Sequence, residues 1–344
     1  MKFLVNTRNP DGGVSYHRLQ EPFKDFPYPV DFFIMPEEVK NIRQYSHLVF
    51  NRSFGWANNE ADQKFIEWAK THGVKIIIDL DDYWVLPEYH TIRWRPDVDY
   101  EVWQSAIIEN LKLADYAWTT TEYLRGKIKE INDIPIAIAR NALNYDDPQW
   151  KKPVNKSNDV NIGWIGSTTH HMDLDMMRRP LAMLDKWAKK SKIKIMKHLA
   201  GYSKGSGWAG EVSKRFYSNF TNNGQYQNIH LIKPVHVANY GYLYGLLDIS
   251  IAPVLENEFN KSKSELKVIE AGARRIPFIG SDVITYSRTG ANIDLCSNSD
   301  EWFNSMKELT SSKSLRQELG KELGEYVRDE YTFKKENESR LSIL

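Results

Sequence analysis

The most informative stretch of this chain runs from Phe259 to Ser281 and reads FNKSKSELKVIEAGARRIPFIGS. Within it, Ser262 is followed three residues later by Glu265, which is the spacing of a capping box and predicts that a helix begins at Lys263. The residues IPFIGS at the end of the stretch are typical of a short buried strand that proline introduces.

The polar face of this helix has the side chains that a nucleotide needs. Lys263, Lys267 and Glu270 are four and three residues apart and therefore share one face. Two lysines near a helix start, where the helix dipole is already positive, favour an anion such as phosphate. Glu270, about two turns into the helix, could accept hydrogen bonds from hydroxyls of the same ligand. A solvated amphipathic helix with solubilising lysines is the alternative, and the pattern alone favours neither.

The pattern FN-x-x-KS-x-LK-x-x-E-x-x-A, followed by the Pro-led strand ending in Ser-Asp, resembles the donor-site segment of GT-B glycosyltransferases, above all the retaining family 4 and its relatives. The resemblance implies an α/β fold with two doubly wound Rossmann-like domains that face each other across a cleft. It also implies that Glu270 holds the ribose of a nucleotide sugar. The family has another glutamate eight residues earlier, where this chain has Ser262, and Lys263 is the candidate replacement.

The composition is that of a globular protein with two domains. The chain has 344 residues, of which 41% are hydrophobic and 26% charged, and this length suits more than one domain. No apolar run approaches the ~20 residues that span a bilayer, and the N-terminus is typical of a first strand rather than a signal peptide. The single Cys296 excludes a disulfide framework and a Cys-rich metal site, so we expect a cytoplasmic protein.

The two parts of the chain differ in charge. Residues 1–150 hold 17 Lys and Arg against 23 Asp and Glu, and the remainder holds 29 Lys and Arg against 22 Asp and Glu. The basic second part suits a phosphorylated donor.

Strand-like runs alternate with helical runs along the whole chain, as in parallel α/β domains. We expect residues 1–150 to form an N-terminal Rossmann-like acceptor-side domain and residues 151–330 a C-terminal Rossmann-like donor domain, with a tail at 331–344 that could cross back to the first domain. The expected strands are 3–6, 32–35, 48–51, 74–80, 116–119, 136–139, 160–165, 193–199, 229–232, 249–253, 277–279 and 293–296. The expected helices are 60–71, 101–113, 122–131, 173–190, 237–246, 264–274 and 301–330.

Two glycines follow the first strand. Gly12 and Gly13 permit a tight turn and a close approach of the backbone to a ligand, as in the glycine loop of the family, and we expect them to contact the donor. The pattern is not G-x-G-x-x-G, so a dinucleotide fingerprint is absent. A plain strand-to-helix turn is the alternative. Arg18, one helical turn further on, either forms a salt bridge at the edge of the core or faces the cleft and binds the acceptor.

Carboxylates end the most hydrophobic strand, at Asp79, Asp81 and Asp82. At the carboxyl end of a strand they could bind sugar hydroxyls or hold a divalent metal. Asp-x-Asp is the metal signature of the GT-A class, but the two-domain layout favours GT-B, which usually needs no metal. We therefore expect Asp81 or Asp82 to act on the acceptor or the transferred sugar, with no metal and no tightly bound cofactor. A helix cap and a surface acid are the alternative.

Aromatic residues crowd the segment 83–103, with Trp84 and Trp94 among them. Aromatic rings stack on the apolar faces of sugars and on nucleobases. Because the segment lacks helical or strand periodicity, we expect a long loop that binds the acceptor through these two tryptophans. Ordinary packing at a domain interface is the alternative.

A second specific segment, IGWIGSTTHHMDL, begins at Ile162. It resembles the G-x-x-G-S-x-x-H-x-x-D-L opening of family 4 relatives, where the turn approaches the donor phosphate and sugar. The resemblance implies that Gly166, Ser167 and Thr168 bind the donor. His170 could bind phosphate or polarise the leaving group, and a structural histidine is the alternative.

The sequence thus predicts a metal-independent hexosyl- or pentosyltransferase that moves a sugar from a nucleoside diphosphate sugar to a hydroxyl of a glycan, a lipid-linked or a small-molecule acceptor. Retention of configuration is what the resemblance to family 4 implies. Such catalysis is mainly positioning and stabilisation of the leaving diphosphate. Two alternatives stay open. One is a phage-type enzyme that glycosylates hydroxymethylated bases in DNA, and the other is a nucleotide-sugar-binding protein without turnover.

Overall fold

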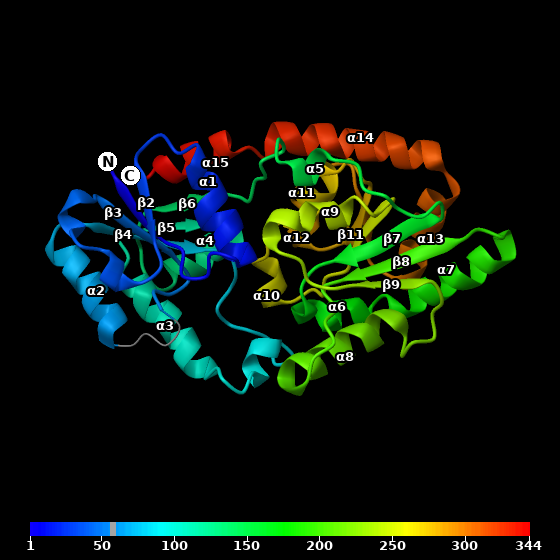
Figure 1. The fold of residues 1–344 in the computed structure, drawn as a ribbon, viewed down its shortest axis with the longest axis horizontal. Helices are drawn as coiled ribbons and strands as arrows, with labels where there is room; N and C mark the ends of the chain where they lie inside the picture. Colours follow the sequence, from blue (N-terminus) through cyan, green and yellow to red (C-terminus); the bar gives the residue numbers. More distant parts are fainter. Residues whose placement is uncertain (56–59) are drawn as a thin grey trace. The chain divides into compact units, whose positions relative to one another are not determined.

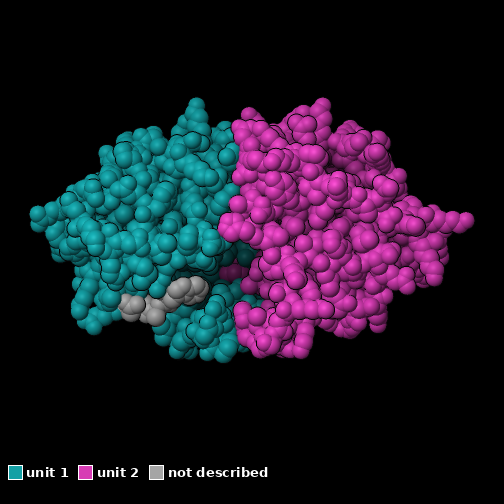
Figure 2. All heavy atoms as spheres, in the orientation of Figure 1, with its two compact units in different colours: residues 1–144, 261–264, 331–344 teal, residues 145–260, 265–330 magenta. Residues whose placement is uncertain are grey.

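The computed structural model describes residues 1–55 and 60–344, which divide into two compact units. Unit 1 comprises residues 1–144, 261–264 and 331–344, and unit 2 comprises residues 145–260 and 265–330. Figure 2 shows the two units in different colours. Each unit contains its own parallel sheet.

The sheet of unit 1 has six strands, and all of its neighbouring pairs are parallel. In sheet order the strands are β2 (Val30–Phe33), β1 (Phe3–Asn6), β3 (His47–Asn51), β4 (Lys75–Leu80), β5 (Tyr116–Thr119) and β6 (Ile136–Ile138). The helices of this unit are η1 (Ser15–Gln20), α1 (Glu21–Lys24), η2 (Pro36–Glu38), η3 (Ile42–Gln44), α2 (Glu60–Thr71), η4 (Thr91–Trp94), α3 (Tyr100–Leu113), α4 (Glu122–Lys129) and α15 (Phe333–Leu341).

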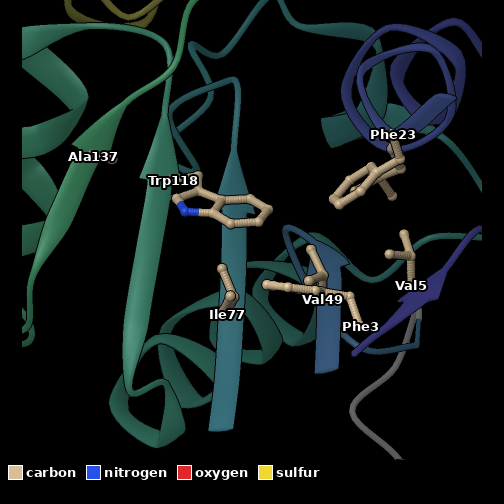
Figure 3. Close-up of a cluster of buried hydrophobic side chains, with 8 residues drawn as sticks. Phe3, Val5, Phe23, Val49, Ile77, Trp118 and Ala137 are labelled. Carbon is tan, nitrogen blue, oxygen red and sulfur yellow. The ribbon is translucent and has the colours of Figure 1, made fainter. Parts of the chain in front are cut away.

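One hydrophobic core cluster of unit 1 brings together residues from five strands and from the helices after β1 (Figure 3). Its members are Phe3, Val5, Leu19, Phe23, Val49, Ile77, Trp118 and Ala137. The end of the chain packs against the same cluster through Leu341, Ile343 and Leu344. The indole nitrogen of Trp118 also donates to the carbonyl oxygen of Arg340 at 3.0 Å. Residues 331–344 are therefore part of the core of unit 1.

The sheet of unit 2 also has six parallel strands (Figure 1). In sheet order they are β12 (Asp294–Cys296), β11 (Phe278–Ser281), β10 (Ile249–Ala252), β7 (Val160–Ile165), β8 (Ile195–Ala200) and β9 (Ile229–Ile232). The helices are α5 (Pro148–Lys151), η5 (Thr168–His170), α6 (His171–Asp175), α7 (Arg178–Ser191), α8 (Gly207–Thr221), η6 (Val237–Asn239), α9 (Tyr240–Tyr244), α10 (Glu258–Lys261), α11 (Leu266–Ala273), α12 (Ile284–Ser287), α13 (Ser299–Ser311) and α14 (Lys313–Glu330).

The predicted strands are confirmed, each within two residues of its expected bounds. Several helices differ from the prediction. The helix expected over 173–190 is interrupted between α6 and α7, and the helix expected over 301–330 is divided at Ser312. The Ser312 hydroxyl accepts a hydrogen bond from the amide of Leu315, so it caps the second of these two helices. The helices α8 and α15 were not predicted.

None of the described helices is long and apolar enough to cross a membrane.

Candidate functional site

The strand order of unit 2 marks where a ligand should bind. From β7 the chain adds β8 and then β9 on one side, and it then returns to place β10 on the other side of β7. Ligands of open α/β sheets bind at the carboxyl ends of the strands beside such a reversal. The residues at this position are Gly166 to Thr168 after β7 and Pro253 to Leu255 after β10.

The turn after β7 is closely packed. A Cβ atom on Gly166 would lie 2.5 Å from Cζ2 of Trp164, so only glycine fits there. The exposed Ser167 caps η5, because its hydroxyl accepts a hydrogen bond from the amide of Thr169 at 3.3 Å. Thr168 is half-buried in the same turn. The hydroxyls expected to bind phosphate are therefore at the carboxyl edge of this sheet.

His170 is oriented by a buried carboxylate. Its Nδ1 lies 2.6 Å from Oδ2 of Asp173, and its ring meets that of Trp164 edge-on at 5.0 Å. The other carboxylate oxygen of Asp173 accepts a hydrogen bond from the amide of Leu255 at 2.8 Å. Because an ionised carboxylate only accepts, this contact favours the hydrogen on Nδ1 of His170. Asp173 thus links the turns that follow β7 and β10.

The half-buried Lys267 and the buried Glu270 form an ion pair on α11. Nζ of Lys267 lies 3.0 Å from Oε2 of Glu270 and 2.8 Å from the hydroxyl of Tyr240. The hydroxyl of Tyr244 donates to the same Oε2 at 2.6 Å, and Glu270 is only 1% exposed. Nζ of Lys267 also lies 5.6 Å from the ring centroid of Trp164, which brings α11 beside β7. The predicted proximity of Lys267 and Glu270 is confirmed.

The cluster holds one cation and one anion. Burial lowers the pKa of Lys267, but the Glu270 carboxylate and the Tyr240 hydroxyl outweigh it and raise the pKa above its usual value. Burial, together with the charge of Glu270, raises the pKa of Tyr240 to about 12 despite the opposing charge of Lys267. Both phenols therefore stay protonated at neutral pH, since the pKa of Tyr244 is also raised by burial and by Glu270.

The expected capping box at Ser262 is wrong, because both of its residues have other partners. The Ser262 hydroxyl accepts a hydrogen bond from the amide of Tyr83 at 3.0 Å, and the Glu265 carboxylate pairs with Arg288 at 3.2 Å. The helix begins at Leu266 instead. Lys263 therefore does not share a helical face with Lys267. It belongs to unit 1, where its Nζ lies 3.4 Å from Oδ1 of Asp82.

Arginines hold the carboxylates at the end of β4. Arg52 makes two hydrogen bonds of 2.9 Å to Asp81 and one of 2.8 Å to Asp82. Burial would raise the pKa of Asp81, but the charge and hydrogen bonds of Arg52 outweigh it and lower the pKa to about 2. Asp81 is therefore an ionised ion-pair partner at neutral pH and is poorly suited to act as a base. Arg52, whose φ is +60°, was not predicted as a site residue.

Arg18 has the first of its two predicted placements. Its guanidinium is 1% exposed and binds both carboxylate oxygens of Asp79, at 3.0 and 2.7 Å. It also donates to the carbonyl oxygen of Ala139 at 2.7 Å. The acceptor-facing placement of Arg18 is thus wrong for this structure, because the buried carboxylate of Asp79 retains the cation. No group of three or more His, Cys, Asp and Glu in the described part of the chain is arranged to hold a metal ion.

The expected aromatic platform is only partly exposed. Trp84 is 4% exposed and packs edge-on against Tyr83 at 5.0 Å, so its ring is not open for stacking, which corrects the prediction. Trp94 is half-buried at the end of η4. The long-loop prediction for residues 83–103 is also corrected, because η4 and the first turn of α3 occupy part of this segment.

Unit 1 has a cavity of about 250 Å³ beside its own strand-order reversal, at the carboxyl ends of β1 and β3. Gly12 and Gly13 line it, as does Arg52. The other lining residues are Asn6, Arg8, Asn9, Val14, Ser15, Leu19, Asn51, Ser53, Gly55, Ile92 and Trp103. The glycine pair was predicted to contact the donor, and that role stays a prediction. Trp103 belongs to the predicted aromatic segment 83–103, but its place beside the glycine turn was not predicted, because the sequence does not show that α3 reaches this turn.

No protein-family model matches the chain, and no curated protein matches it in sequence. Solved structures do match. A sucrose-phosphate synthase from Thermosynechococcus elongatus has a TM-score of 0.59 and 11% identity over 86% of this chain and 71% of that one. A glycosyltransferase from Rickettsia africae has a TM-score of 0.58 and 13% identity over 99% and 88% of the two chains. TarM of S. aureus, solved with UDP and α-GlcNAc-glycerol, has a TM-score of 0.57 and 16% identity over 86% and 55%.

This is the GT-B fold. The predicted α/β class and the two Rossmann-like sheets are confirmed. Five of the predicted donor-site residues lie at or beside the strand-order reversal of unit 2: Gly166, Ser167, Thr168, Lys267 and Glu270. Their roles in binding stay predictions.

Proposed function

We propose that the protein is a glycosyltransferase that takes a hexose or pentose from a nucleoside diphosphate sugar and transfers it to a hydroxyl group. The observation that carries the proposal is the ion pair of the half-buried Lys267 and the buried Glu270 on α11, beside the strand-order reversal of unit 2, in a chain with the GT-B fold. A carboxylate and an ammonium group side by side suit a ligand that has both hydroxyls and phosphates.

In this proposal unit 2 binds the donor. Glu270 accepts hydrogen bonds from the ribose hydroxyls, and its orientation is already fixed by Tyr244 and Lys267. Lys267 balances the charge of the diphosphate, to which the hydroxyls of Ser167 and Thr168 donate. UDP in the TarM structure supports a uridine nucleotide as the first one to test.

The cavity of unit 1 is the proposed acceptor site. Its mixture of amide, hydroxyl and guanidinium groups with one indole ring is typical of sugar recognition, since the ring covers an apolar sugar face while polar groups bind the hydroxyls. Asn9, Ser53, Arg52 and Trp103 supply these groups. The acceptor is thus proposed to be a polar molecule with several hydroxyls, such as a glycan.

Catalysis would depend on positioning and on the stabilisation of the leaving diphosphate. His170 is the candidate to donate a hydrogen bond at the reacting end of the donor, and Asp173 fixes its orientation. We propose retention of configuration, because the sequence resembles family 4. We also propose independence of metal, because the cation of Lys267 can balance the diphosphate.

The test is a thermal-shift screen of UDP-, GDP- and dTDP-sugars, followed by a transfer assay with radiolabelled donor and a panel of glycans. A ligand that binds the native state raises the melting temperature, and Glu270→Gln should make this increase much smaller at the same ligand concentration. Glu308→Gln, on the exposed surface of α13, is the matched control and should keep the increase. Stabilisation without transfer or hydrolysis would favour a nucleotide-sugar-binding protein, and no stabilisation by any donor would refute the proposal.

A further inference from the structure

A second cavity, of about 470 Å³, lies at the amino ends of β10 and β11 in unit 2. The amino and carboxyl ends of parallel strands lie at opposite edges of a sheet, so this cavity is at the opposite edge from Gly166 to Thr168. It is lined by Pro153, Val154, Lys156, Gly245, Leu247, Asp248, Arg274, Arg275, Ile276, Pro277, Lys313, Arg316 and Gln317. These residues come from the segment before β7, the turns before β10 and β11, and the first turn of α14.

The lining of this cavity is strongly basic. Its cations are Lys156, Arg274, Arg275, Lys313 and Arg316, whereas Asp248 is the one carboxylate among the described lining residues. Asp248 already pairs with Lys156 at 2.6 Å. An excess of four cations over one concave surface attracts anions.

Arg274 is held in the cavity by neutral groups. Its Nη1 donates to the carbonyl oxygens of Gln149 and Lys152, at 3.2 and 2.9 Å. A Cβ atom on Gly245 would lie 2.0 Å from Nη2 of Arg274, so the absence of a side chain at Gly245 leaves room for the guanidinium. Burial lowers the pKa of Arg274 below its usual value. Backbone carbonyl oxygens, which carry no formal charge, hold this half-buried guanidinium, so its positive charge can attract an anionic ligand.

Arg316 and Arg275, which also line this cavity, are fixed in place by neighbouring backbone. Nη1 of Arg316 donates to the last carbonyl oxygens of α13, those of Leu309 and Thr310, at 2.6 and 3.1 Å. Arg275 has a φ of +55°, and a Cβ atom on Gly320 of α14 would lie 2.2 Å from its carbonyl oxygen, so the turn and the helix are in close contact. Val154, Leu247, Ile276 and Pro277 add apolar surface to the lining. Cations and apolar walls in one concave site suit a phosphorylated organic molecule.

We propose that this cavity of unit 2 binds the phosphate group of a small phosphorylated molecule, at a site separate from the nucleotide-sugar site. A concave site of this size with apolar walls favours a small ligand over a membrane surface or a nucleic acid, both of which need an extended basic face. The proposal does not depend on the function proposed for the other edge of the sheet.

Lysine footprinting by mass spectrometry tests the site directly in the full-length protein. Phenyl phosphate should protect Lys313 from acetylation, whereas phenol should not. Lys321, on the same helix but outside the cavity and exposed, is the internal control and should react equally in both cases. No protection of Lys313 at saturating phenyl phosphate would overturn the proposal.

Variants then identify the residues that bind. Arg274→Gln should weaken the binding of phenyl phosphate roughly tenfold, and Lys313→Gln roughly threefold because its side chain is exposed. Gly245→Ala should act like Arg274→Gln, since the added methyl displaces the guanidinium while the backbone, at φ −60°, accepts alanine. Lys321→Gln should leave the affinity unchanged. Protection of Lys313 that persists undiminished in Arg274→Gln and Gly245→Ala, or protection by phosphatidylglycerol vesicles or duplex DNA but not by phenyl phosphate, would contradict a small-molecule site.

Discussion

Glu270→Gln is the substitution that separates ligand binding from stability in the proposed donor site. The glutamine has the shape of the glutamate, and its oxygen can still accept the hydrogen bond from Tyr244. It no longer carries the charge that neutralises Lys267, 3.0 Å away. A ribose hydroxyl would therefore meet an uncharged acceptor, and Lys267 would remain a cation beside a neutral amide oxygen instead of a carboxylate.

The charge and the burial of Glu270 set the expected losses of ligand affinity and of stability in this variant. Hydrogen bonds to a charged group contribute about 1.5–3 kcal/mol, so the dissociation constant of uridine and of UDP should rise roughly 10- to 150-fold. Lys267 is 19% exposed, so the loss of its carboxylate should also lower the free energy of unfolding, by about 1–3 kcal/mol. The double variant Glu270→Gln with Lys267→Met removes both charges, and most of the lost stability should then return.

Isothermal titration with uridine and UDP, and urea unfolding monitored by tryptophan fluorescence, measure the two effects. Lys267→Met alone should weaken UDP but spare uridine, because only UDP has the diphosphate. Lys307→Met, on the exposed surface of α13, is the charge-matched control. Uridine binding of wild-type strength in the double variant would refute the assignment of Glu270 to the ribose.

Three further predictions concern acid stability, metal and acceptor. Burial, with a smaller contribution from His230, lowers the pKa of His198 to about 4. At His198 the unfolded chain therefore binds a proton that the folded chain does not as the pH falls from about 6.5 to about 4, so this residue should contribute about 3 kcal/mol to the fall in the free energy of unfolding in that window. Urea unfolding at both pH values should show a smaller difference in His198→Gln, and an equal difference would contradict the prediction. Transfer should persist in EDTA, and complete loss of activity that Mn²⁺ restores would refute metal independence. Asn9→Ala should raise the acceptor KM roughly fivefold without changing UDP affinity, with Asn158→Ala as the exposed control; an unchanged KM would remove the unit 1 cavity from the proposal.

The strands could be predicted because their signal is local. Runs such as Ile76 to Ile78 are continuous and β-branched, which is how a strand buried on both faces is recognised, and all three residues are fully buried. The pair formed by Lys267 and Glu270 was visible for the same reason, because residues three apart on a helix are neighbours. The partners Tyr240 and Tyr244 come from another segment, and no spacing rule connects them to α11.

The errors at the site have a common physical cause, which is competition from tertiary partners. Ser262 and Glu265 have the spacing of a capping box, yet the Ser262 hydroxyl accepts its hydrogen bond from the amide of Tyr83. That amide is 179 residues away in the chain, so a local pattern cannot reveal it. Arg52, which holds Asp81, was missed, and the salt bridge of Arg18 was predicted without its partner Asp79. Arg52 and Arg18 reach Asp81 and Asp79 across 29 and 61 residues.

Contacts outside α11 fix the helix that carries Lys267 and Glu270. Near its start, the Glu265 carboxylate is held by Arg288. Along its length, α11 lies beside α14 (Figure 1), and a Cβ atom on Gly272 would come within 2.7 Å of a methyl group of Val327. A helix fixed in this way presents Glu270 in one orientation before any ligand arrives. Binding of a nucleotide sugar would therefore cost little conformational entropy, because the site is already ordered. When this cost is small, a few polar contacts are enough for specific binding.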